Sequence, residues 1–306
     1  MKRAFVITKP IQYLIALTIR EQLSNDVEDL IIINDFRDSQ LFVDKIYKKN
    51  WNKVHFLNKK KDLLNVVKLA DYEELYLDSD VGFLNYLLFL RLKIFNSKIN
   101  LHIFEEGIGT YLKETYLYCQ LKIALFKLFG IGTNFGSCIF TNSIYLYSTS
   151  EYLKLNQRKP TNVVQIDLNI ESLYKKNIEY FGFLCNCGLI DKFISVLNYK
   201  HTCVIILGTW IEPHLKIDYL NESLKSAISE AKINIDDDFI IVKEHPNENR
   251  RNIIPIIENS VHFNENAPAE ILVYHLLIHF NQIKIIHHES TVTHYVTNNN
   301  VKFYNY

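Results

Sequence analysis

The sequence predicts an α/β protein made of two doubly wound domains in tandem. In both halves of the 306-residue chain, short apolar runs alternate with longer segments of helical periodicity. Apolar residues make up 48% of the chain, which is enough to fill the interiors of two domains. Because strand–helix alternation is typical of parallel sheets covered on both faces, we expect one such sheet in each half.

The first half alternates apolar runs of four to six residues with helical segments in which apolar residues recur every three or four positions. The runs are bounded by polar or turn-forming residues, as buried strands are. The predicted strands are residues 4–8, 29–34, 54–57, 74–77 and 100–104, and the predicted helices are residues 11–23, 39–48 and 85–95.

A polar stretch at residues 148–161 interrupts the alternation and is the expected linker. It divides the chain into domains 1–155 and 156–306. The alternation resumes in the second domain, with predicted strands at residues 203–207, 239–243 and 283–287 and predicted helices at residues 219–231 and 269–275.

Charge and cysteine content exclude several classes of function. The 34 basic residues balance the 34 acidic ones, so the chain has no net field that would hold a nucleic acid. Among the five cysteines only Cys185 and Cys187 are close in sequence, and no second pair completes a zinc site. The apolar run at residues 4–8 leads into Lys9-Pro10 without a cleavage site. We therefore expect a cytoplasmic protein with reduced thiols.

The segment at residues 116–129 places Lys122 and Lys127 among apolar side chains. The most lipid-like run, residues 121–131, also carries both lysines and is too short to cross a bilayer, which needs about 20 apolar residues. The pattern of residues 116–129 suits a helix lying at the inner face of the membrane, which would make the protein a peripheral membrane protein. The alternative is a buried helix whose lysines reach the surface.

Two acidic motifs follow predicted strands of the first domain. Glu105-Glu106-Gly107 comes after residues 100–104, and adjacent carboxylates in a partly dry site suit a general base. An acidic helix start is the alternative. Asp78-Ser79-Asp80 matches the Asp-x-Asp pattern that holds a divalent ion, although such carboxylates more often cap a helix. Glycine-rich dinucleotide and ATP motifs are absent from the sequence.

Two motifs follow strands of the second domain. Lys243-Glu244-His245-Pro246 places an ammonium and an imidazole at a strand end, where both can face a phosphate. Ser290-Thr291 follows the strand at residues 283–287, and hydroxyls at a helix start form an anion site. A surface histidine and an ordinary N-cap are the respective alternatives.

The order and spacing of these motifs resemble those of bacterial sialyltransferases of glycosyltransferase family 52 and of related GT-B enzymes. These share an acidic-acidic-Gly motif, a His-Pro motif and a Ser/Thr-Ser/Thr motif. Thr8-Lys9-Pro10-Ile11-Gln12 is similar to the Thr-Pro-x-Gln loop of family 52, and Ala267-Pro268-Ala269-Glu270 is similar to the segment whose glutamate contacts the ribose of CMP. The resemblance implies a GT-B fold, with two Rossmann-like domains facing a central cleft.

The resemblance further implies an inverting, metal-independent sialyltransferase without a cofactor. It would transfer sialic acid from CMP-Neu5Ac to a terminal sugar, with galactose expected, on a bacterial surface glycan such as lipopolysaccharide, capsule or O-antigen. Glu106 would be the general base, with Glu105 as its fallback, and His245 would protonate or hydrogen-bond the leaving phosphate. The implied donor-binding residues are Lys243, Pro246, Gly208, Thr209, Glu270, Ser290 and Thr291, and the implied acceptor-side residues are Thr8, Pro10, Gln12 and Gly107.

Several further functions stay open at this point. The donor could carry glucose or Kdo, since related GT-B enzymes transfer those sugars. A non-catalytic sugar-nucleotide or glycan-binding protein would share the fold without using the paired carboxylates. A homodimer is a further expectation, and the acceptor linkage is not determined by the sequence.

Overall fold

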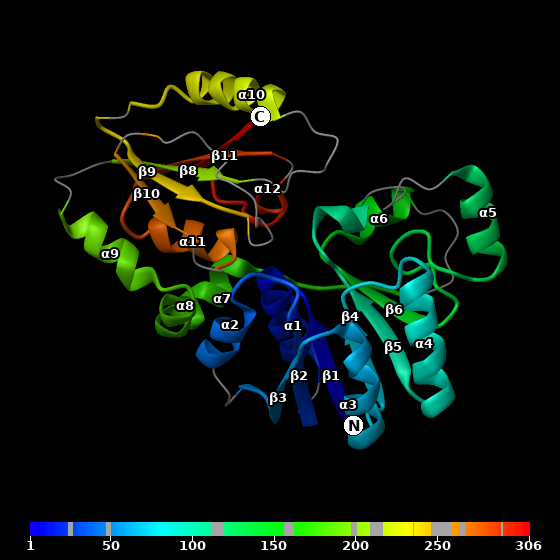
Figure 1. The fold of residues 1–306 in the computed structure, drawn as a ribbon. Helices are drawn as coiled ribbons and strands as arrows, with labels where there is room; N and C mark the ends of the chain where they lie inside the picture. The colour runs from blue at the N-terminus through cyan, green and yellow to red at the C-terminus, as the bar shows by residue number, and fades with distance from the viewer. Residues whose placement is uncertain are drawn as a thin grey trace. The chain divides into compact units, whose positions relative to one another are not determined.

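The computed structural model describes most of the 306 residues. The chain divides into two compact units, Met1–Leu168 (unit 1) and Asn169–Tyr306 (unit 2), and Figure 1 shows the elements of each. The residues that are not described are 24–26, 47–49, 112–118, 156–161, 197–200, 209–216, 235, 246–256, 258, 264–266 and 289.

Unit 1 is built on a parallel sheet, with the strand order β3-β2-β1-β4-β5-β6-β7 among its described residues. The chain builds the sheet outward from β1 in one direction and then from β4 in the other, so the order reverses between β1 and β4. The strands are β1 (Lys2–Ile7), β2 (Val27–Ile33), β3 (Lys53–Leu57), β4 (Glu74–Leu77), β5 (Asn100–Phe104), β6 (Thr141–Leu146) and β7 (Asn162–Gln165). The helices are α1 (Pro10–Gln22), α2 (Ser39–Lys45), η2 (Lys60–Asp62), α3 (Leu63–Ala70), α4 (Phe83–Phe95), η3 (Ile108–Tyr111), α5 (Gln120–Leu128) and α6 (Thr149–Leu155).

Successive side chains of a strand point to opposite faces of the sheet, and those of β1 are buried on both faces. Ala4 and Val6 of β1 belong to a core shared with Phe89 of α4. Phe5, which lies between them in sequence, stacks on Tyr76 of β4 at 4.6 Å and meets Trp51 edge-on at 5.6 Å. Burying each such side chain contributes about 1.5–3 kcal/mol. The central strands are therefore apolar throughout, as doubly wound sheets require.

Unit 2 repeats this plan with the described strand order β10-β9-β8-β11-β12, again entirely parallel. The order reverses between β8 and β11. The strands are β8 (Thr202–Leu207), β9 (Phe239–Lys243), β10 (Ser260–Phe263), β11 (Gln282–His287) and β12 (Val301–Asn305). The helices are α7 (Ile170–Lys176), α8 (Ile178–Leu184), α9 (Cys187–Val196), α10 (Ile217–Glu230), α11 (Ala269–Leu276) and α12 (Val292–Tyr295).

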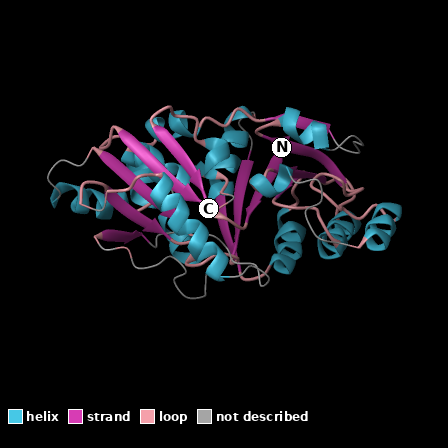
Figure 2. Ribbon diagram, turned by 90° about the horizontal axis from the view of Figure 1, so that it is seen from above, coloured by secondary structure: helices cyan, strands magenta, loops and turns pink. Residues whose placement is uncertain are grey.

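Helices cover both faces of the second sheet as well. Val204 and Ile206 of β8 pack with Leu220 and Leu224 of α10 in one core. Helix α11 lies on the opposite face, and the strands of each unit run between helices (Figures 1 and 2). The C-terminal Tyr306 is part of this core, and its hydroxyl donates a hydrogen bond to the carbonyl of Leu207 at 2.9 Å.

These observations confirm the two doubly wound α/β units that the sequence predicts. The expected linker at residues 148–161 is wrong in its first half, because Thr149–Leu155 form α6. The division falls after Leu168 instead of residue 155, since Asn162–Gln165 form β7 and pair with β6 of the first sheet. The C-terminal 15 residues after Thr291 end in a strand, β12, which pairs with β11.

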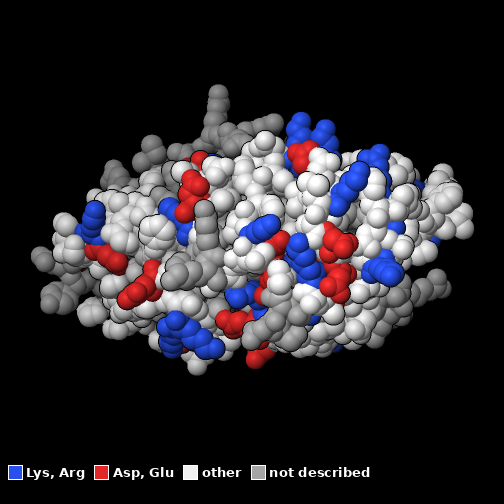
Figure 3. All heavy atoms as spheres, turned by 90° about the horizontal axis from the view of Figure 1, so that it is seen from below, with Lys and Arg blue, Asp and Glu red and all other residues white. Residues whose placement is uncertain are grey.

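The surface carries charges of both signs side by side, and the face seen in Figure 3 has no large area of one sign. Among the described residues, no helix is both long and apolar enough to cross a membrane. Helix α5 nevertheless exposes an apolar surface, which comprises Leu121, Leu125, Leu128 and Phe129 at 72%, 46%, 76% and 62% exposure. In this helix only Ile123 is buried, which contradicts the alternative of a buried helix over the described part of residues 116–129; residues 116–118 lie outside the described residues.

Candidate functional site

Polar side chains gather after the carboxyl ends of the central strands in each unit. In unit 1 they follow β1, β4 and β5, and among the described residues of unit 2 they follow β9 and β11, while Gly208 follows β8. In open α/β sheets, ligands bind outside the carboxyl ends of the strands where the strand order reverses. The reversals between β1 and β4 and between β8 and β11 therefore define two candidate subsites.

The loop from β1 to α1 is organised by Gln12. Pro10 occupies the first position of α1, where its fixed backbone angle favours the helix. The buried Gln12 Oε1 accepts hydrogen bonds from the backbone N–H groups of Thr8 at 2.7 Å and Lys9 at 3.0 Å. Gln12 Nε2 is also buried and has no hydrogen-bond partner among the described residues. This orphaned amide donor is one that a ligand oxygen could satisfy.

Lys9, at the start of the same loop, forms an ion pair with Glu106 through Glu106 Oε1. The Glu106 side chain is 25% exposed, and its Oε2 atom has no partner among the described residues. The turn that presents it is closed by Thr110, whose hydroxyl accepts from the Glu106 N–H at 2.9 Å. Gly107 has a φ of 127°, a conformation that favours glycine. Glu106 thus combines one oriented carboxylate oxygen with one available oxygen.

Glu105 faces the interior of unit 1 and is fully buried. Its Oε2 accepts hydrogen bonds from the Tyr111 hydroxyl and from the Tyr147 N–H, each at 2.6 Å. The Tyr111 oxygen in turn accepts from the Ser148 N–H at 2.9 Å. The two neighbouring glutamates therefore have different surroundings, and those of Glu105 argue against its expected role as a fallback base.

Three further polar residues complete the cluster of unit 1, and the sequence pattern did not single out Asp35 or Lys60. Asp78 accepts from the Lys60 ammonium at 2.6 Å and from the Thr8 hydroxyl at 2.9 Å, which links the ends of β1 and β4. Burial is the largest effect that raises the pKa of Asp35, and the Asp78 and Glu106 charges raise it further. The Lys60 and Lys9 charges oppose this rise. Lone charged residues in loops give no periodic signal, so only the fold identifies them as neighbours.

The alternative of a metal-binding Asp78-Ser79-Asp80 does not fit this geometry. Asp80 is fully buried, and its carboxylate accepts from the N–H groups of Gly136 and Cys138, each at 2.9 Å, and from the Thr141 hydroxyl at 2.7 Å. Its two oxygens hold the β4 end to the segment before β6 and to Thr141, the first residue of β6. Asp80 has a structural role, and it offers no vacant oxygen to a cation beside Asp78.

In unit 2, Gly208 brings the ends of β8 and β9 together. Its N–H donates to the Lys243 carbonyl at 2.8 Å. A β-carbon at residue 208 would lie 3.1 Å from the backbone nitrogen of His245, so a side chain here would crowd the His245 loop. Lys243 is buried, with its ammonium 5.9 Å from the centre of the Phe263 ring, and His245 is half-buried. The expected donor residues Thr209 and Pro246 lie outside the described residues.

Glu270, at the start of α11, lies beside Thr291, which follows β11. The Thr291 hydroxyl donates to Glu270 Oε1 at 3.2 Å. Burial raises the pKa of Glu270, against the opposing effects of its backbone hydrogen bond, the Thr291 hydroxyl and the Lys243 charge. Ser290 Oγ accepts a long hydrogen bond, 3.4 Å, from the Val292 N–H. The helix after Thr291 has only four residues, so its dipole adds little to the expected anion site.

The comparison with known proteins identifies the fold. The structure of a UDP-GlcNAc 2-epimerase from Neisseria meningitidis bound to UDP-GlcNAc is similar to this chain, with a TM-score of 0.58 and 10% identity. The alignment covers 93% of this chain and 77% of the epimerase chain. The GT-B domain of a sialyltransferase from Photobacterium damselae is similar as well, with a TM-score of 0.51 and 11% identity. That alignment covers 99% of this chain and 90% of the sialyltransferase chain. A UDP-GlcNAc 2-epimerase from Methanocaldococcus jannaschii has a TM-score of 0.52 and 13% identity, and its alignment covers 93% of this chain and 78% of the epimerase chain.

The chain therefore has a GT-B-like fold. No protein-family model and no curated sequence matches it. Identities of 10–13% show the fold alone, and membership of glycosyltransferase family 52 stays a prediction.

Proposed function

We propose that this protein is an inverting sialyltransferase that uses CMP-Neu5Ac as its donor and a terminal galactose of a bacterial surface glycan as its acceptor. The observation that carries the proposal is the placement of the motifs. In unit 1, Glu106 follows β5, the neighbour of β4, and pairs with Lys9 after β1. In unit 2, Lys243 ends β9, Ser290 and Thr291 follow β11, and Thr291 is hydrogen-bonded to Glu270. The likeness to a sialyltransferase over 99% of the chain supports the same proposal at the level of the fold.

In this mechanism unit 1 supplies the base. The acceptor hydroxyl gives its proton to Glu106 Oε2 while its oxygen bonds to C2 of sialic acid. The bond between C2 and the phosphate oxygen breaks, and CMP leaves with that electron pair. Lys9 orients the carboxylate through Oε1, and a general base in such a position contributes about 100- to 10,000-fold to the rate.

Unit 2 supplies the donor site. His245 donates a hydrogen bond or proton to the departing phosphate, and the hydroxyls of Ser290 and Thr291 donate to its oxygens. Charge-assisted hydrogen bonds of this kind are stronger than neutral ones, and they stabilise charge that develops as CMP leaves. Glu270 accepts from the ribose hydroxyls, after exchanging its present bond with Thr291 for one to the nucleotide.

A monophosphate leaving group needs no metal in this scheme. Lys243 and an imidazolium together offset its charge, so we expect initial rates of transfer to be the same with and without excess EDTA. A complete loss of activity that manganese restores would contradict this part of the proposal.

The structural neighbours also define the competing function. The neighbours from Neisseria meningitidis and Methanocaldococcus jannaschii are UDP-GlcNAc 2-epimerases, so a UDP-sugar is the competing ligand. A GT-B transferase of glucose or Kdo and a non-catalytic glycan-binding protein compete with the proposal as well. Each of these functions predicts a different response to the same set of sugar nucleotides.

The decisive assay incubates the purified chain separately with CMP-Neu5Ac, CMP-Kdo, UDP-glucose and UDP-GlcNAc, with and without lactose as a galactose acceptor. We expect CMP release from CMP-Neu5Ac that lactose accelerates, with sialyllactose as the product. Conversion of UDP-GlcNAc to its 2-epimer, or turnover of another donor alone, would replace the proposal. Binding without turnover of any donor would indicate a binding protein.

We also propose that unit 1 contacts the inner face of the membrane through the α5 apolar surface. Lys122 and Lys127 are exposed beside it, so anionic lipid headgroups would meet ammonium groups while the apolar side chains enter the interface. A cytoplasmic enzyme that modifies a lipid-linked glycan would gain access to its acceptor in this way.

A further inference from the structure

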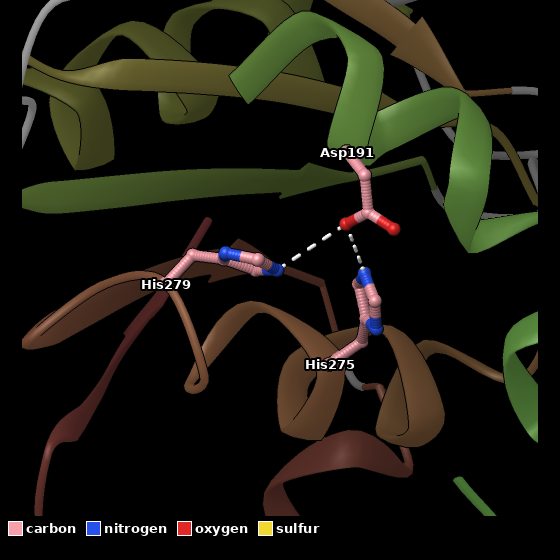
Figure 4. Close-up of side chains that lie close together, drawn as sticks. All are labelled: Asp191, His275 and His279. Carbon is pink, nitrogen blue, oxygen red and sulfur yellow. Dashed lines mark hydrogen bonds and ion pairs between the residues drawn. The ribbon is translucent and has the colours of Figure 1, made fainter. Parts of the chain in front are cut away.

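Two histidines of unit 2 converge on one carboxylate, away from the motifs of the donor site. His275 belongs to α11, and His279 lies four residues later in the turn that follows it. Their rings both face Asp191 of α9 (Figure 4). Asp191 Oδ1 lies 2.8 Å from His275 Nε2 and 3.2 Å from His279 Nε2. These three side chains therefore bring two imidazole nitrogens and a carboxylate oxygen to one point.

We propose that Asp191, His275 and His279 bind a divalent transition-metal ion, with zinc as the preferred ion. Their ligand atoms all lie within 4.8 Å of one another. A tetrahedral zinc ion with bonds of about 2.1 Å separates its ligand atoms by about 3.4 Å. The observed separations of 2.8 and 3.2 Å need to open by less than about 1 Å to admit the ion.

The residue types match this ion better than the harder cations. Imidazole nitrogens favour zinc and its neighbours in the first transition series, whereas calcium and magnesium favour sites made only of oxygen ligands. Histidines four residues apart present both rings on the same side of a helical turn. The His275 side chain is 9% exposed, and those of His279 and Asp191 are 32% and 44% exposed, so an ion can enter from solvent and a water can complete its shell.

Tyr174 of α7 holds His275 in the orientation that a ligand needs. The Tyr174 hydroxyl lies 2.8 Å from His275 Nδ1, and both side chains are buried. When Nε2 binds a metal, Nδ1 carries the proton and donates it in a hydrogen bond to the Tyr174 oxygen. Histidine ligands almost always have such a partner on the second ring nitrogen, and its loss typically weakens metal binding about 10- to 100-fold.

The ion would have a structural role distinct from the proposed transfer. It would join α9 to the carboxyl-terminal end of α11, while Glu270 lies at the opposite end of α11. Zinc binding to the folded chain alone would raise its stability by mass action. Whether or not zinc binds here, the donor and base assignments are unchanged, because turnover and nucleotide binding test them separately.

The test is a titration of the full chain, freed of metal by dialysis against a chelator, with zinc chloride at neutral pH. We expect one zinc ion per chain, and affinity at least about tenfold weaker in His279→Gln and in Asp191→Asn. Tyr174→Phe should weaken zinc binding about tenfold or more while leaving the three ligands in place. His262→Ala removes an exposed histidine of β10 and should bind zinc like the wild type.

Thermal unfolding provides a second reading. Added zinc should raise the unfolding midpoint of the wild type and of His262→Ala, and it should leave the midpoint of His279→Gln unchanged. His279 is partly exposed, so its substitution should not prevent folding. Cobalt in place of zinc should give the visible absorption of a four- or five-coordinate ion in the wild type and in His262→Ala, and in neither ligand variant.

Nearby thiols define the outcome that would overturn the assignment. Cys187 is buried beside Cys185 and His275, and its hydrogen bonds with Cys185 and then His275 lower the pKa of its thiol to about 6. Zinc binding that persists in His279→Gln and Asp191→Asn but disappears in Cys187→Ser would show that a thiolate site was mistaken for this one. The absence of stoichiometric zinc binding to the wild type would equally refute the proposal.

Discussion

The strand reversals of the two units have the same topology but different chemistry. In unit 1 the cluster contains Lys9, Asp35, Lys60, Asp78 and Glu106, and both lysines are ion-paired. In unit 2 the cluster combines one buried lysine and one buried glutamate with hydroxyls and an imidazole. One sheet plan therefore supplies a charged, proton-accepting edge in one unit and an edge rich in hydrogen-bond donors in the other.

The same contrast appears between two adjacent residues of unit 1. Glu105 is fully buried with two donors on one oxygen, whereas Glu106 is partly exposed with one oxygen available. Adjacent glutamates leave a strand end in different directions, so one can support the fold while the other meets a substrate. The comparison predicts opposite consequences when each is changed to glutamine.

The largest expected effect is on turnover. Glu106→Gln should reduce sialyl transfer by at least about 100-fold, because glutamine cannot accept the acceptor proton. The free energy of unfolding and the affinity for CMP should stay close to those of the wild type. Steady-state rates and CMP titrations on the same preparation check both statements. Full activity in this variant would mean that Glu106 is not the base.

Glu105→Gln should instead act on stability. It replaces two charge-assisted hydrogen bonds, from the Tyr111 hydroxyl and the Tyr147 N–H, with weaker neutral ones to the amide oxygen in a buried site, which should lower the free energy of unfolding by about 1–3 kcal/mol. Denaturant unfolding of the Glu105→Gln and Glu106→Gln pair measures the difference, with each variant serving as the control for its neighbour. If the Glu105→Gln variant is as stable as the wild type but inactive, Glu105 would be the general base and Glu106 would not.

A smaller effect should distinguish the units at a lipid surface. If unit 1 is the acceptor side, the double change Leu121→Ser and Leu128→Ser on α5 should reduce co-flotation with anionic vesicles at low salt. Phe193→Ser on α9, which removes a 42% exposed phenylalanine from unit 2, is the matched control and should float like the wild type. Equal flotation of all three proteins, or none with the wild type, would remove the membrane contact.

The sequence was most informative where a strand is buried on both faces. Strands β4, β5 and β9 have the predicted bounds, because continuous apolar runs between polar residues mark a central parallel strand. The strands that were not predicted include β7, β10 and β12, which lie at sheet edges and mix polar with apolar residues. Edge strands bury less surface, so their periodicity is weak.

The candidate sites show the same limit. Motifs that directly follow a strand, such as those containing Glu106 and Lys243, could be placed from the sequence because parallel strands end at one edge. Asp35 and Lys60 give no motif of their own, and only the folded sheet brings them near Asp78 and Glu106. In the Asp191–His275–His279 cluster, the two histidines form a local pair four residues apart, but Asp191 comes from α9, so only the folded chain shows the third ligand.

The most direct test of the account is the nucleotide preference of the unit 2 site, measured by isothermal titration with CMP, CDP and UDP on wild type and His245→Ala. If Lys243 and His245 together offset the charge of one phosphate and Ser290 and Thr291 hold its oxygens, the proposed donor residues include no further cation to offset a second phosphate. We therefore expect CMP to bind most tightly, and His245→Ala to weaken CMP binding about tenfold or more. Tighter binding of UDP that His245→Ala leaves unchanged would contradict the sialyltransferase proposal and leave only the GT-B-like fold.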